Sequence, residues 1–467
     1  MIQNTVTEKK STEKSTNGTK NNFSPVHVEP RDVHETLAKH MLTDGFDIVL
    51  DLKKSKGNYL YDSRSNKRYL DFFSFFASNA LGMNHPKLDN DEFKQKLGYV
   101  AVNKPSNSDI YTVEMAEFVE TFYRVAQPEY LPYAFYVDGG GLAIENALKV
   151  AFDWKVRKNF VKGYTEERGR QVIHFRHAFH GRTGYTMSLT NTDPVKTKYY
   201  PKFKWPRIIN PAIRFPLNEE NLAHVIKEEE LAVSQIKDAI TNNPDDIAAL
   251  IIEPIQSEGG DNHFRKEFFL QLRQICDENE ILFIFDEVQT GIGLTGKMWA
   301  HQHFVEPDLI AFGKKTHVCG CLASKCIDDV LDNVFRKPSR INSTFGGNLV
   351  DMVRFTRILE VIEEDNLVEN ARVQGEFLLS EIQKLSEEFP ELVSNPRGKG
   401  LLCAMDLDTA LNRDQLRVKA YEEGLILIGC GDRAIRFRPS LTIQKSELEE
   451  GMKIIRKALS ELVVGDL

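Results

Sequence analysis

The sequence has no long hydrophobic run and no excess of basic residues. Its 467 residues include 60 Lys and Arg against 68 Asp and Glu, and the net charge of −8 gives no electrostatic reason to expect binding to nucleic acid or to an anionic membrane. Residues 1–25 are rich in Lys, Thr, Asn and Ser, without the apolar core of a secretory signal or the Arg-rich pattern of a targeting peptide. We therefore expect residues 1–28 to form a disordered tail.

Cysteine is also scarce. The chain has six cysteines, and three of them, Cys319, Cys321 and Cys326, lie close together. A zinc site would draw on such a cluster, but paired C-x-x-C ligands are missing, so the sequence favours ordinary reduced thiols and no metal site. Reduced thiols are typical of a cytoplasmic protein.

The chain is long enough for more than one lobe. From about residue 84, short apolar runs alternate with helix-length stretches, which predicts an α/β fold with a mostly parallel sheet and helices on both faces. The predicted strands are 134–137, 171–175, 247–252, 281–285 and 309–312, separated by helices such as 142–158 and 264–280. A long helical stretch follows Gly347 to about residue 389, and smaller α+β pieces follow it. We expect a large domain at 84–345 and a smaller α+β domain at 346–467, to which residues 29–83 contribute.

Two of the predicted strands end in groups that suit one cofactor. Strand 281–285 runs into Asp286, and strand 309–312 runs into Gly313 and Lys314. Neighbouring parallel strands deliver side chains to one edge of a sheet. A carboxylate that keeps a pyridine nitrogen protonated and an amine that forms a Schiff base are the two groups that pyridoxal 5′-phosphate requires. We therefore expect Asp286 and Lys314 to hold this cofactor.

Alternation along the strand adds detail to this site. Asp286 and Val288 share one face, and Glu287 takes the other, so the cofactor ring is expected to meet Val288 while Asp286 pairs with its nitrogen. Lys315 competes with Lys314 for the role of the reactive amine, but alternation lets only one of them face the cofactor. Burial beside a cationic ring lowers the pKa of a lysine and favours its neutral, nucleophilic form. A lone strand-end carboxylate is more often a cap or a surface group, and it is the pairing with Lys314 that favours the cofactor site.

Two turns supply groups for a phosphate and a substrate. A glycine triplet that ends in Gly140 and Gly141 follows one strand and opens a helix, where bare amides bind a phosphate well. Phe179 and Arg182 follow another strand, so Phe179 is a candidate for stacking on the ring and Arg182 for binding a substrate carboxylate. Each local pattern also fits an ordinary glycine turn, a core phenylalanine and a surface arginine.

Jointly, these motifs resemble the class III aminotransferases, which are fold-type I pyridoxal phosphate enzymes with a large sheet domain and a smaller α+β domain. The segments that carry the resemblance occur in the family's order and spacing from about residue 30 to the end: 179–182, 253–256, 286–289, 313–314 and 343–348. Within the class, the chain resembles the lysine ε-aminotransferases at 72–78, 103–109, 137–146, 312–316 and 436–439. One departure is the phosphate loop, where this chain has three glycines and lacks the family's hydroxyl side chain.

The resemblance implies a role for each residue of the cofactor site. Lys314, rather than Lys315, would be the Schiff-base lysine. Asp286 would pair with the pyridine nitrogen, and Gln289 would lie near the phenolic oxygen. Gly140 and Gly141 would bind the phosphate, and Thr344 would reach the phosphate of the neighbouring subunit. The minimum active unit would then be a homodimer.

The resemblance also implies the reaction, in which the ε-amino group of L-lysine passes to 2-oxoglutarate and gives L-glutamate and 2-aminoadipate 6-semialdehyde, which cyclises. Lysine's carboxylate would bind Arg182 far from the chemistry, whereas glutamate's α-carboxylate would bind Arg436 close to it. Without that carboxylate, Arg436 is an unpaired and costly charge. Glu258 matches the family position of a carboxylate that pairs with Arg436 and later swings away. We expect Glu258, Arg436, Arg182 and Gln289 to bind the substrates.

Other interpretations stay open. An ω-aminotransferase that takes ornithine or 4-aminobutyrate shares the chemistry and most of these residues, and Glu258 and Arg436 also fit a loop carboxylate and a surface ion pair. A cofactor-binding protein with a decayed site is disfavoured because Lys314, Asp286 and both arginines occur together. An NAD-dependent Rossmann enzyme is disfavoured because no G-x-G-x-x-G pattern follows the strand and Lys314 would have no role.

Overall fold

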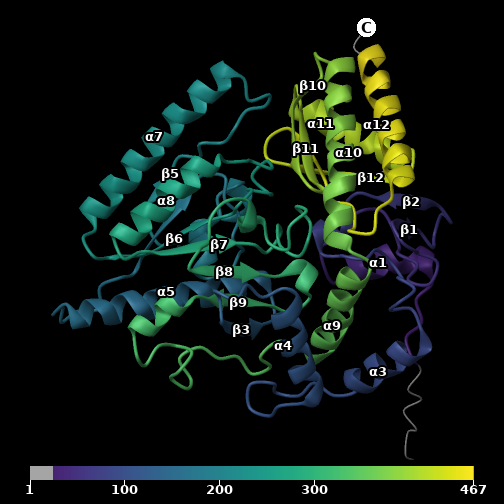
Figure 1. Ribbon diagram of the computed structural model, residues 1–467. Helices are drawn as coiled ribbons and strands as arrows, with labels where there is room; N and C mark the ends of the chain where they lie inside the picture. The colour runs from purple at the N-terminus through teal and green to yellow at the C-terminus, as the bar shows by residue number, and fades with distance from the viewer. Residues whose placement is uncertain (1–24, 466–467) are drawn as a thin grey trace, which may run out of the picture.

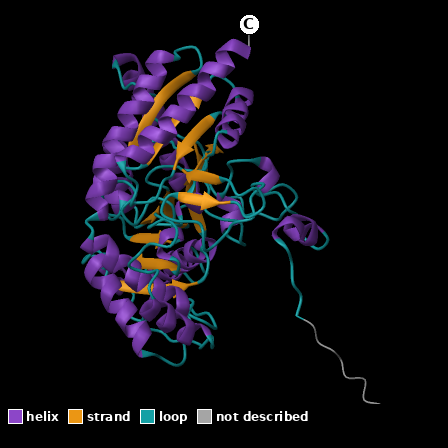
Figure 2. Cartoon of the chain, turned by 90° about the vertical axis from the view of Figure 1, so that its right-hand side faces the viewer, coloured by secondary structure: helices purple, strands orange, loops and turns teal. Residues whose placement is uncertain are grey.

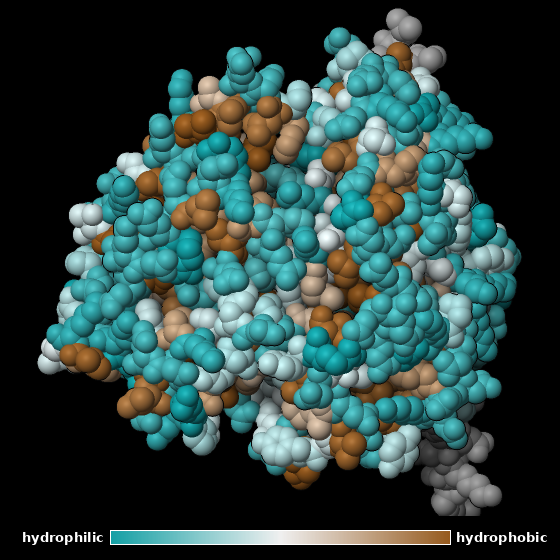
Figure 3. Space-filling model, in the orientation of Figure 1, coloured by the Kyte–Doolittle hydropathy of each residue, from teal (hydrophilic) through white to brown (hydrophobic). Residues whose placement is uncertain are grey.

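The computed structural model describes residues 25–465 (Figure 1). Most of the predicted disordered tail therefore lies outside the described residues, and its last four residues, 25–28, are exposed without helix or strand. The face of the molecule seen in Figure 3 is largely hydrophilic, and its apolar side chains are scattered in small groups. No helix between residues 25 and 465 is both long enough and apolar enough to cross a membrane.

The larger part of the molecule is built on a seven-stranded sheet. Its strand order is β3 (Tyr133–Val137), β9 (Cys319–Ala323), β8 (Leu309–Phe312), β7 (Leu282–Asp286), β6 (Ile247–Ile252), β4 (Gln171–Phe175) and β5 (Arg207–Ile208). All neighbouring pairs are parallel except the two that β9 makes with β8 and β3. The predicted mostly parallel α/β sheet is confirmed. The sequence analysis missed β9, because Cys-Gly-Cys-Leu-Ala is short and its glycine interrupts the apolar run.

The central strands of this sheet bury both of their faces. On β7, Phe283 and Phe285 belong to one hydrophobic core with α8 (Lys266–Glu278), whereas Leu282 and Ile284 belong to a second core with α5 (Gly140–Val161). Figure 1 shows α8 beside α7 (Glu219–Asn242), well apart from α5. Burial on both faces explains why these strands read as continuous apolar runs instead of alternating ones.

The rest of the chain forms two smaller sheets, which Figure 2 shows as strands set among helices. One has the order β10 (Val393–Lys399), β11 (Leu402–Leu407), β14 (Ala434–Phe437), β13 (Ile428–Cys430), all antiparallel. In the other, β1 (Tyr59–Tyr61) and β2 (Arg68–Asp71) are joined by β12 (Leu425–Ile426), which runs parallel to β2. From this pairing we propose that residues 29–83 and 346–467 form one smaller domain beside the large one at 84–345.

Helices complete both parts of the molecule. The long helix predicted after Gly347 is two helices, α9 (Leu349–Glu364) and α10 (Leu367–Glu388), because Asn366 between them adopts a left-handed conformation with φ of 49°. Asparagine tolerates that conformation better than most residues, and it ends the first helix. The remaining α-helices of the described residues are α1 (Val33–Ala38), α2 (Ser74–Ala77), α3 (Asp91–Ala101), α4 (Val113–Val125), α6 (Thr186–Leu189), α11 (Ala410–Glu422) and α12 (Lys445–Gly465).

The short turn α2 is left-handed. Its four residues, Ser74–Ala77, all have positive φ, between 43° and 65°, although none is glycine. Left-handed backbone costs roughly 1–2 kcal/mol for each such residue, so the surroundings must impose it. The buried carboxylate of Asp71 accepts hydrogen bonds from the N–H groups of Phe73 and Ser74, each at 2.8 Å, and so fixes the start of the turn. The turn brings the ring of Phe76 to 5.6 Å from the guanidinium of Arg436.

Candidate active site

Asp286 is the last residue of β7, and the structure holds its carboxylate firmly. The Oδ2 atom lies 2.8 Å from Nδ1 of His180, and Oδ1 accepts a 3.0 Å hydrogen bond from the N–H of Val288. The next residue, Glu287, faces the opposite way, where it accepts a 2.7 Å bond from the N–H of His301 and lies 3.1 Å from that ring. Asp286 and Glu287 thus contact different histidines on opposite sides, as alternation predicts, whereas Val288 lies in the turn that follows β7, so strand alternation does not extend to it.

Lys314 follows β8 at the same edge of the sheet and begins a 3-10 turn, Lys314–Thr316. Its φ of 56° is left-handed, a conformation that a lysine rarely adopts and that is often found at functional sites. Burial and the charge of Arg436 lower the pKa of Lys314 to about 8, against the opposing effect of Asp286. The amine therefore loses its proton far more readily than an exposed lysine does.

Lys315 has a different environment. Its Nζ atom donates a 3.1 Å hydrogen bond to the backbone carbonyl of Gln289, and its side chain is buried. Burial, followed by the charge of Lys314, holds the pKa of Lys315 well below its ordinary value. The Lys315 amine is thus committed to a backbone contact, which leaves Lys314 as the amine for chemistry.

The turn that carries the glycine triplet lies against the side chain of Val288, next to this site. A Cβ atom added to Gly140 would lie 3.0 Å from Cγ1 of Val288, and one added to Gly313 would lie 3.2 Å from the same atom. A Cβ on Gly141 would lie 3.3 Å from Thr183, so Gly140, Gly141 and Gly313 all fill tight places. The N-terminus of α5, with its free amide groups, therefore lies next to the turn that carries Lys314. A phosphate at these amides, with a pyridine ring over Val288, fits the residues that are present.

Two buried arginines from β14 and the residue after it, Arg436 and Arg438, lie beside Gln289. Arg438 forms an ion pair with Asp261 in which both side chains are wholly buried. Arg436 is just as buried, but its partner Glu258, at 2.7 Å, keeps 27% of its side chain exposed. The Nε atom of Arg436 has no hydrogen-bond partner among the described residues. The ion pair of Arg438 is therefore a fixed part of the fold, whereas Arg436 has a counter-ion that can move and a donor to spare.

Glu258 and Arg436 line a cavity of about 840 Å³, with Phe73 and Phe76 on its wall. Lys196, which was not predicted from the sequence, also lines this cavity, and its Nζ atom lies 2.6 Å from Oε1 of Glu258. Burial on its own raises the pKa of Glu258, but Arg436 and Lys196 outweigh it and leave the pKa below its ordinary value. The sequence analysis missed Lys196, because it lies in a polar stretch with a second lysine nearby and reads as a surface loop.

The structure does not bring Arg182 into this cavity. Its side chain is exposed and lines a neighbouring cavity of about 650 Å³ together with Glu145 and Lys149. Phe179, from the same loop, lies nearer: its ring centroid is 5.4 Å from Nζ of Lys196. Its N–H donates a 2.9 Å bond to Glu253, and burial raises the pKa of that carboxyl to about 7.

Thr344 lies away from these residues, on an exposed loop before α9. Its backbone carbonyl accepts a 2.6 Å hydrogen bond from the hydroxyl of Ser106, and its own side chain is exposed. The contact ties the loop to the segment 106–109 and leaves the Thr344 hydroxyl directed at no residue among those described.

The three clustered cysteines form no metal site in the described part of the chain, where no group of three His, Cys, Asp or Glu side chains is placed to hold an ion. Cys319 and Cys321 lie on β9 and are buried. Burial raises the pKa of Cys321, and also that of Cys326, to about 12. In the protein as described, these groups are therefore protonated thiols at neutral pH.

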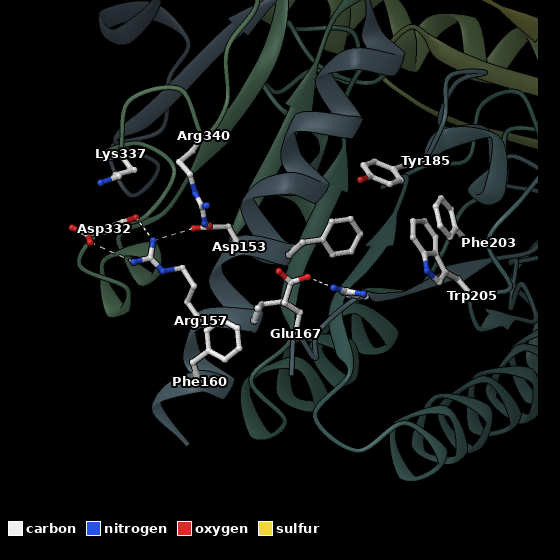
Figure 4. A pocket seen from close by; sticks show the side chains of 13 residues that line it. Asp153, Arg157, Phe160, Glu167, Tyr185, Phe203, Trp205, Asp332, Lys337 and Arg340 are labelled. Atoms are coloured by element: carbon white, nitrogen blue, oxygen red, sulfur yellow. Dashed lines mark hydrogen bonds and ion pairs between the residues drawn. The ribbon is translucent and has the colours of Figure 1, made fainter. Parts of the chain in front are cut away.

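A further cavity of about 630 Å³ lies along the C-terminal half of α5 (Figure 4). Its walls are aromatic, with Phe160 and Trp205 among them, and its arginines are already neutralised. Figure 4 shows these ion pairs, which are Arg157 with Asp332 and Asp153, Arg170 with Glu167, and Arg340 with Asp153. This cavity thus lacks a buried arginine with a spare donor, the feature that Arg436 gives to the other cavity.

Comparison with known proteins identifies the family of the chain. The family model of the class III aminotransferases matches residues 43–459. The L-lysine-epsilon aminotransferase of Mycobacterium tuberculosis H37Rv is 52% identical over 92% of this chain and 96% of that protein, and the enzyme of the same name from Amycolatopsis lactamdurans is 48% identical over 93% and 97%. A solved structure of lysine aminotransferase from M. tuberculosis, in the internal aldimine form, matches with a TM-score of 0.91 and 52% identity over 93% of this chain and 99% of that one. The chain belongs to the class III aminotransferases, and pyridoxal 5′-phosphate is its cofactor.

Proposed function

We propose that this aminotransferase transfers the ε-amino group of L-lysine to 2-oxoglutarate. The products are L-glutamate and 2-aminoadipate 6-semialdehyde, whose aldehyde cyclises with its own α-amine. The names and the 48–52% identity of the two relatives support lysine as the donor. The observation in this chain that carries the proposal is the pair of Arg436 with Glu258, a buried cation whose counter-ion is partly exposed.

The residues around Lys314 account for the chemistry. Pyridoxal phosphate, when bound, supplies an electron sink for the charge that develops on the reacting carbon. Asp286, positioned by His180, keeps a proton on the pyridine nitrogen. Lys314, with its pKa lowered to about 8, offers a neutral amine for attachment and later moves the proton at the substrate carbon as general acid and base.

Two substrates must use the same cavity in turn. With Glu258 in place on Arg436, the cavity accepts the uncharged chain of lysine, because no unpaired cation faces that chain. With Glu258 rotated away, Arg436 accepts the α-carboxylate of 2-oxoglutarate, and its spare Nε adds a second donor. The family resemblance assigns lysine's carboxylate, at the far end of that substrate, to Arg182, although the Arg182 side chain lines a different cavity in the structure.

We also propose a homodimer and a cytoplasmic location. The exposed Thr344 loop is free to meet the phosphate site of a second subunit, as the family resemblance implies. The six cysteines are all unpaired, which suits a reducing compartment. Analytical ultracentrifugation checks the assembly, and a Thr344→Ala variant that dimerises but binds pyridoxal phosphate as tightly as the parent would overturn the role of Thr344.

The identity of the amine donor is tested by absorbance spectroscopy. The purified holoenzyme is mixed with L-lysine in the absence of any keto acid, and the long-wavelength cofactor band is expected to shift, whereas Lys314→Ala should lack that band. Ornithine and 4-aminobutyrate are the matched alternatives. A band that ignores lysine and responds to one of these would keep the family and reject lysine.

The switch has its own test. Glu258→Ala should impair the lysine half-reaction, because Arg436 then faces the aliphatic chain without its carboxylate. Steady-state kinetics with lysine and with 2-oxoglutarate measure both halves. Unchanged constants for both substrates would refute the switch.

A further inference from the structure

One carboxylate in the active-site cavity is shared by two cations. Oε2 of Glu258 lies 2.7 Å from Nη2 of Arg436, while Oε1 lies 2.6 Å from Nζ of Lys196. The Lys196 side chain is 17% exposed and that of Glu258 is 27% exposed, so both lie at the mouth of the cavity, whereas Arg436 is buried at 1%. Glu258 thus bridges an inner cation and an outer one.

The backbone on both sides of this bridge is fixed. Lys196 ends a short 3-10 turn, Pro194–Lys196, whose start is capped by the carboxylate of Asp193 through the N–H of Val195 at 2.9 Å. The carbonyl of Glu258 accepts a 3.0 Å hydrogen bond from the N–H of Gly431. Movement of the Glu258 carboxylate is therefore a rotation of its side chain, not a displacement of its loop.

The other cations at the mouth of the cavity already have partners. Arg413 and Arg417 line the same cavity, and both pair with Asp414. Lys196 forms no ion pair except that with Glu258 among the described residues, and its only other polar contact is a 3.2 Å bond to the hydroxyl of Thr192. When the Glu258 carboxylate leaves Arg436, Lys196 is therefore the cation that remains to pair with it.

We propose that Lys196 is a positioning residue that holds Glu258 during the acceptor half-reaction. When the α-carboxylate of 2-oxoglutarate takes Arg436, Glu258 loses its inner partner and keeps its outer one. In the state that accepts lysine, Glu258 pairs with both Arg436 and Lys196, so loss of Lys196 leaves one of its two ionic contacts. In the state that accepts 2-oxoglutarate, Glu258 pairs with Lys196 alone, so loss of Lys196 leaves it with no ionic contact. The inference rests on the proposed two-substrate function and adds a residue to it, because Lys196 decides how readily the enzyme passes from one substrate to the other.

The test is Lys196→Met, which keeps the length and removes the charge. We expect the KM for 2-oxoglutarate to rise about fivefold, as for the loss of a partly exposed ion pair of about 1 kcal/mol. The KM for lysine and the kcat should change less than twofold. Lys196→Arg should restore the KM for 2-oxoglutarate, and Lys198→Met, at an exposed lysine two residues away, is the charge-matched control.

Two further measurements separate this role from direct binding of substrate by Lys196. Succinic semialdehyde offers an aldehyde without an α-carboxylate, so it does not need Arg436, and its KM should not change in Lys196→Met. In a Glu258→Gln background, Lys196→Met should add no further effect, because the residue that it acts on is gone. An equal rise of the KM for lysine, 2-oxoglutarate and succinic semialdehyde, or an effect that persists in the Glu258→Gln background, would overturn the proposal in favour of a substrate-binding lysine.

The proposed function and this inference fail in different ways. A parent enzyme whose cofactor band ignores lysine rejects the donor. A parent enzyme that uses lysine and 2-oxoglutarate, with a Lys196→Met variant whose constants are all unchanged, rejects only the positioning role.

Discussion

Nδ1 of His180 lies 2.8 Å from Oδ2 of Asp286, and both side chains are buried. Asp286 is thereby aimed from the end of β7 into the site. The same strand end has a second pair of this kind on its other face, where His301 lies 3.1 Å from Glu287. Under the proposed function, the pair at Asp286 serves the cofactor and the pair at Glu287 serves the fold.

Replacement of His180 by alanine should therefore weaken cofactor binding. A hydrogen bond to a charged group contributes about 1.5–3 kcal/mol, so the Kd for pyridoxal phosphate should rise roughly tenfold or more. Fluorescence titration of the apoenzyme measures this Kd. His301→Ala is the matched control, which should lower the thermal unfolding midpoint and leave the Kd unchanged. Equal effects of both variants on the Kd would contradict the division of roles.

The rate at which the apoenzyme captures pyridoxal phosphate should depend on pH through Lys314. Its pKa is about 8, so the reactive neutral amine is the minor form at lower pH and the main form at higher pH. The rate constant should therefore rise about tenfold per pH unit below 8 and level off above it. Stopped-flow absorbance records the reaction. Lys315→Met should keep this profile, whereas an unchanged rate between pH 6.5 and pH 9 would exclude Lys314 as the titrating nucleophile.

The two buried arginines should differ in what their loss affects. Arg438→Met leaves Asp261 buried without its counter-ion, which should cost about 3–5 kcal/mol of folding stability. Arg436→Met leaves Glu258 partly exposed and still paired with Lys196, so the loss should be about 1 kcal/mol. Thermal unfolding of the two variant apoenzymes measures these losses of stability. Arg436→Met should instead raise the KM for 2-oxoglutarate, and equal loss of stability in the two variants would contradict this assignment.

The phosphate turn should tolerate no side chain at Gly140. A Cβ there would lie 3.0 Å from Cγ1 of Val288, so Gly140→Ala must displace Val288 from the ring's position. We expect a roughly tenfold higher Kd for pyridoxal phosphate, equal to about 1.4 kcal/mol. Adding Val288→Ala removes the clash and should recover part of the affinity. Equilibrium titration decides, and a Gly140→Ala enzyme with the parent's Kd would show that the turn does not depend on this contact.

The sequence was sufficient to predict that Asp286 and Lys314 lie at one edge of the sheet. β7 and β8 are apolar runs that end in polar groups, and this pattern follows directly from burial on both faces, so Asp286 and Lys314 were predicted to meet. The family resemblance, not the strand pattern, separated Lys314 from Lys315. The structure supplies a physical reason, since the Lys315 amine is bound to the carbonyl of Gln289.

Other features depend on contacts between distant segments, which local patterns do not encode. Lys196 and Glu258 are 62 positions apart, and nothing near either residue indicates that they meet. The antiparallel β9 depends on hydrogen bonds to β3 and β8, not on its own weak propensity. The left-handed turn Ser74–Ala77 is the clearest example, because its four residues include no glycine and nothing in their sequence predicts positive φ. Tertiary packing imposes each of these features.

The pairing of β2 with β12 has a consequence for how the protein is made. Leu70 and Asp71 are paired with Leu425 and Ile426, more than 350 positions further along the chain. On the ribosome, the large sheet, which ends at β9, can assemble before β12 has been synthesised, whereas β1 and β2 must wait with their apolar side chains unprotected. The proposed smaller domain is therefore the last part of the chain to close, and a truncation before residue 425 should leave the large sheet folded and the hairpin of β1 and β2 prone to aggregation.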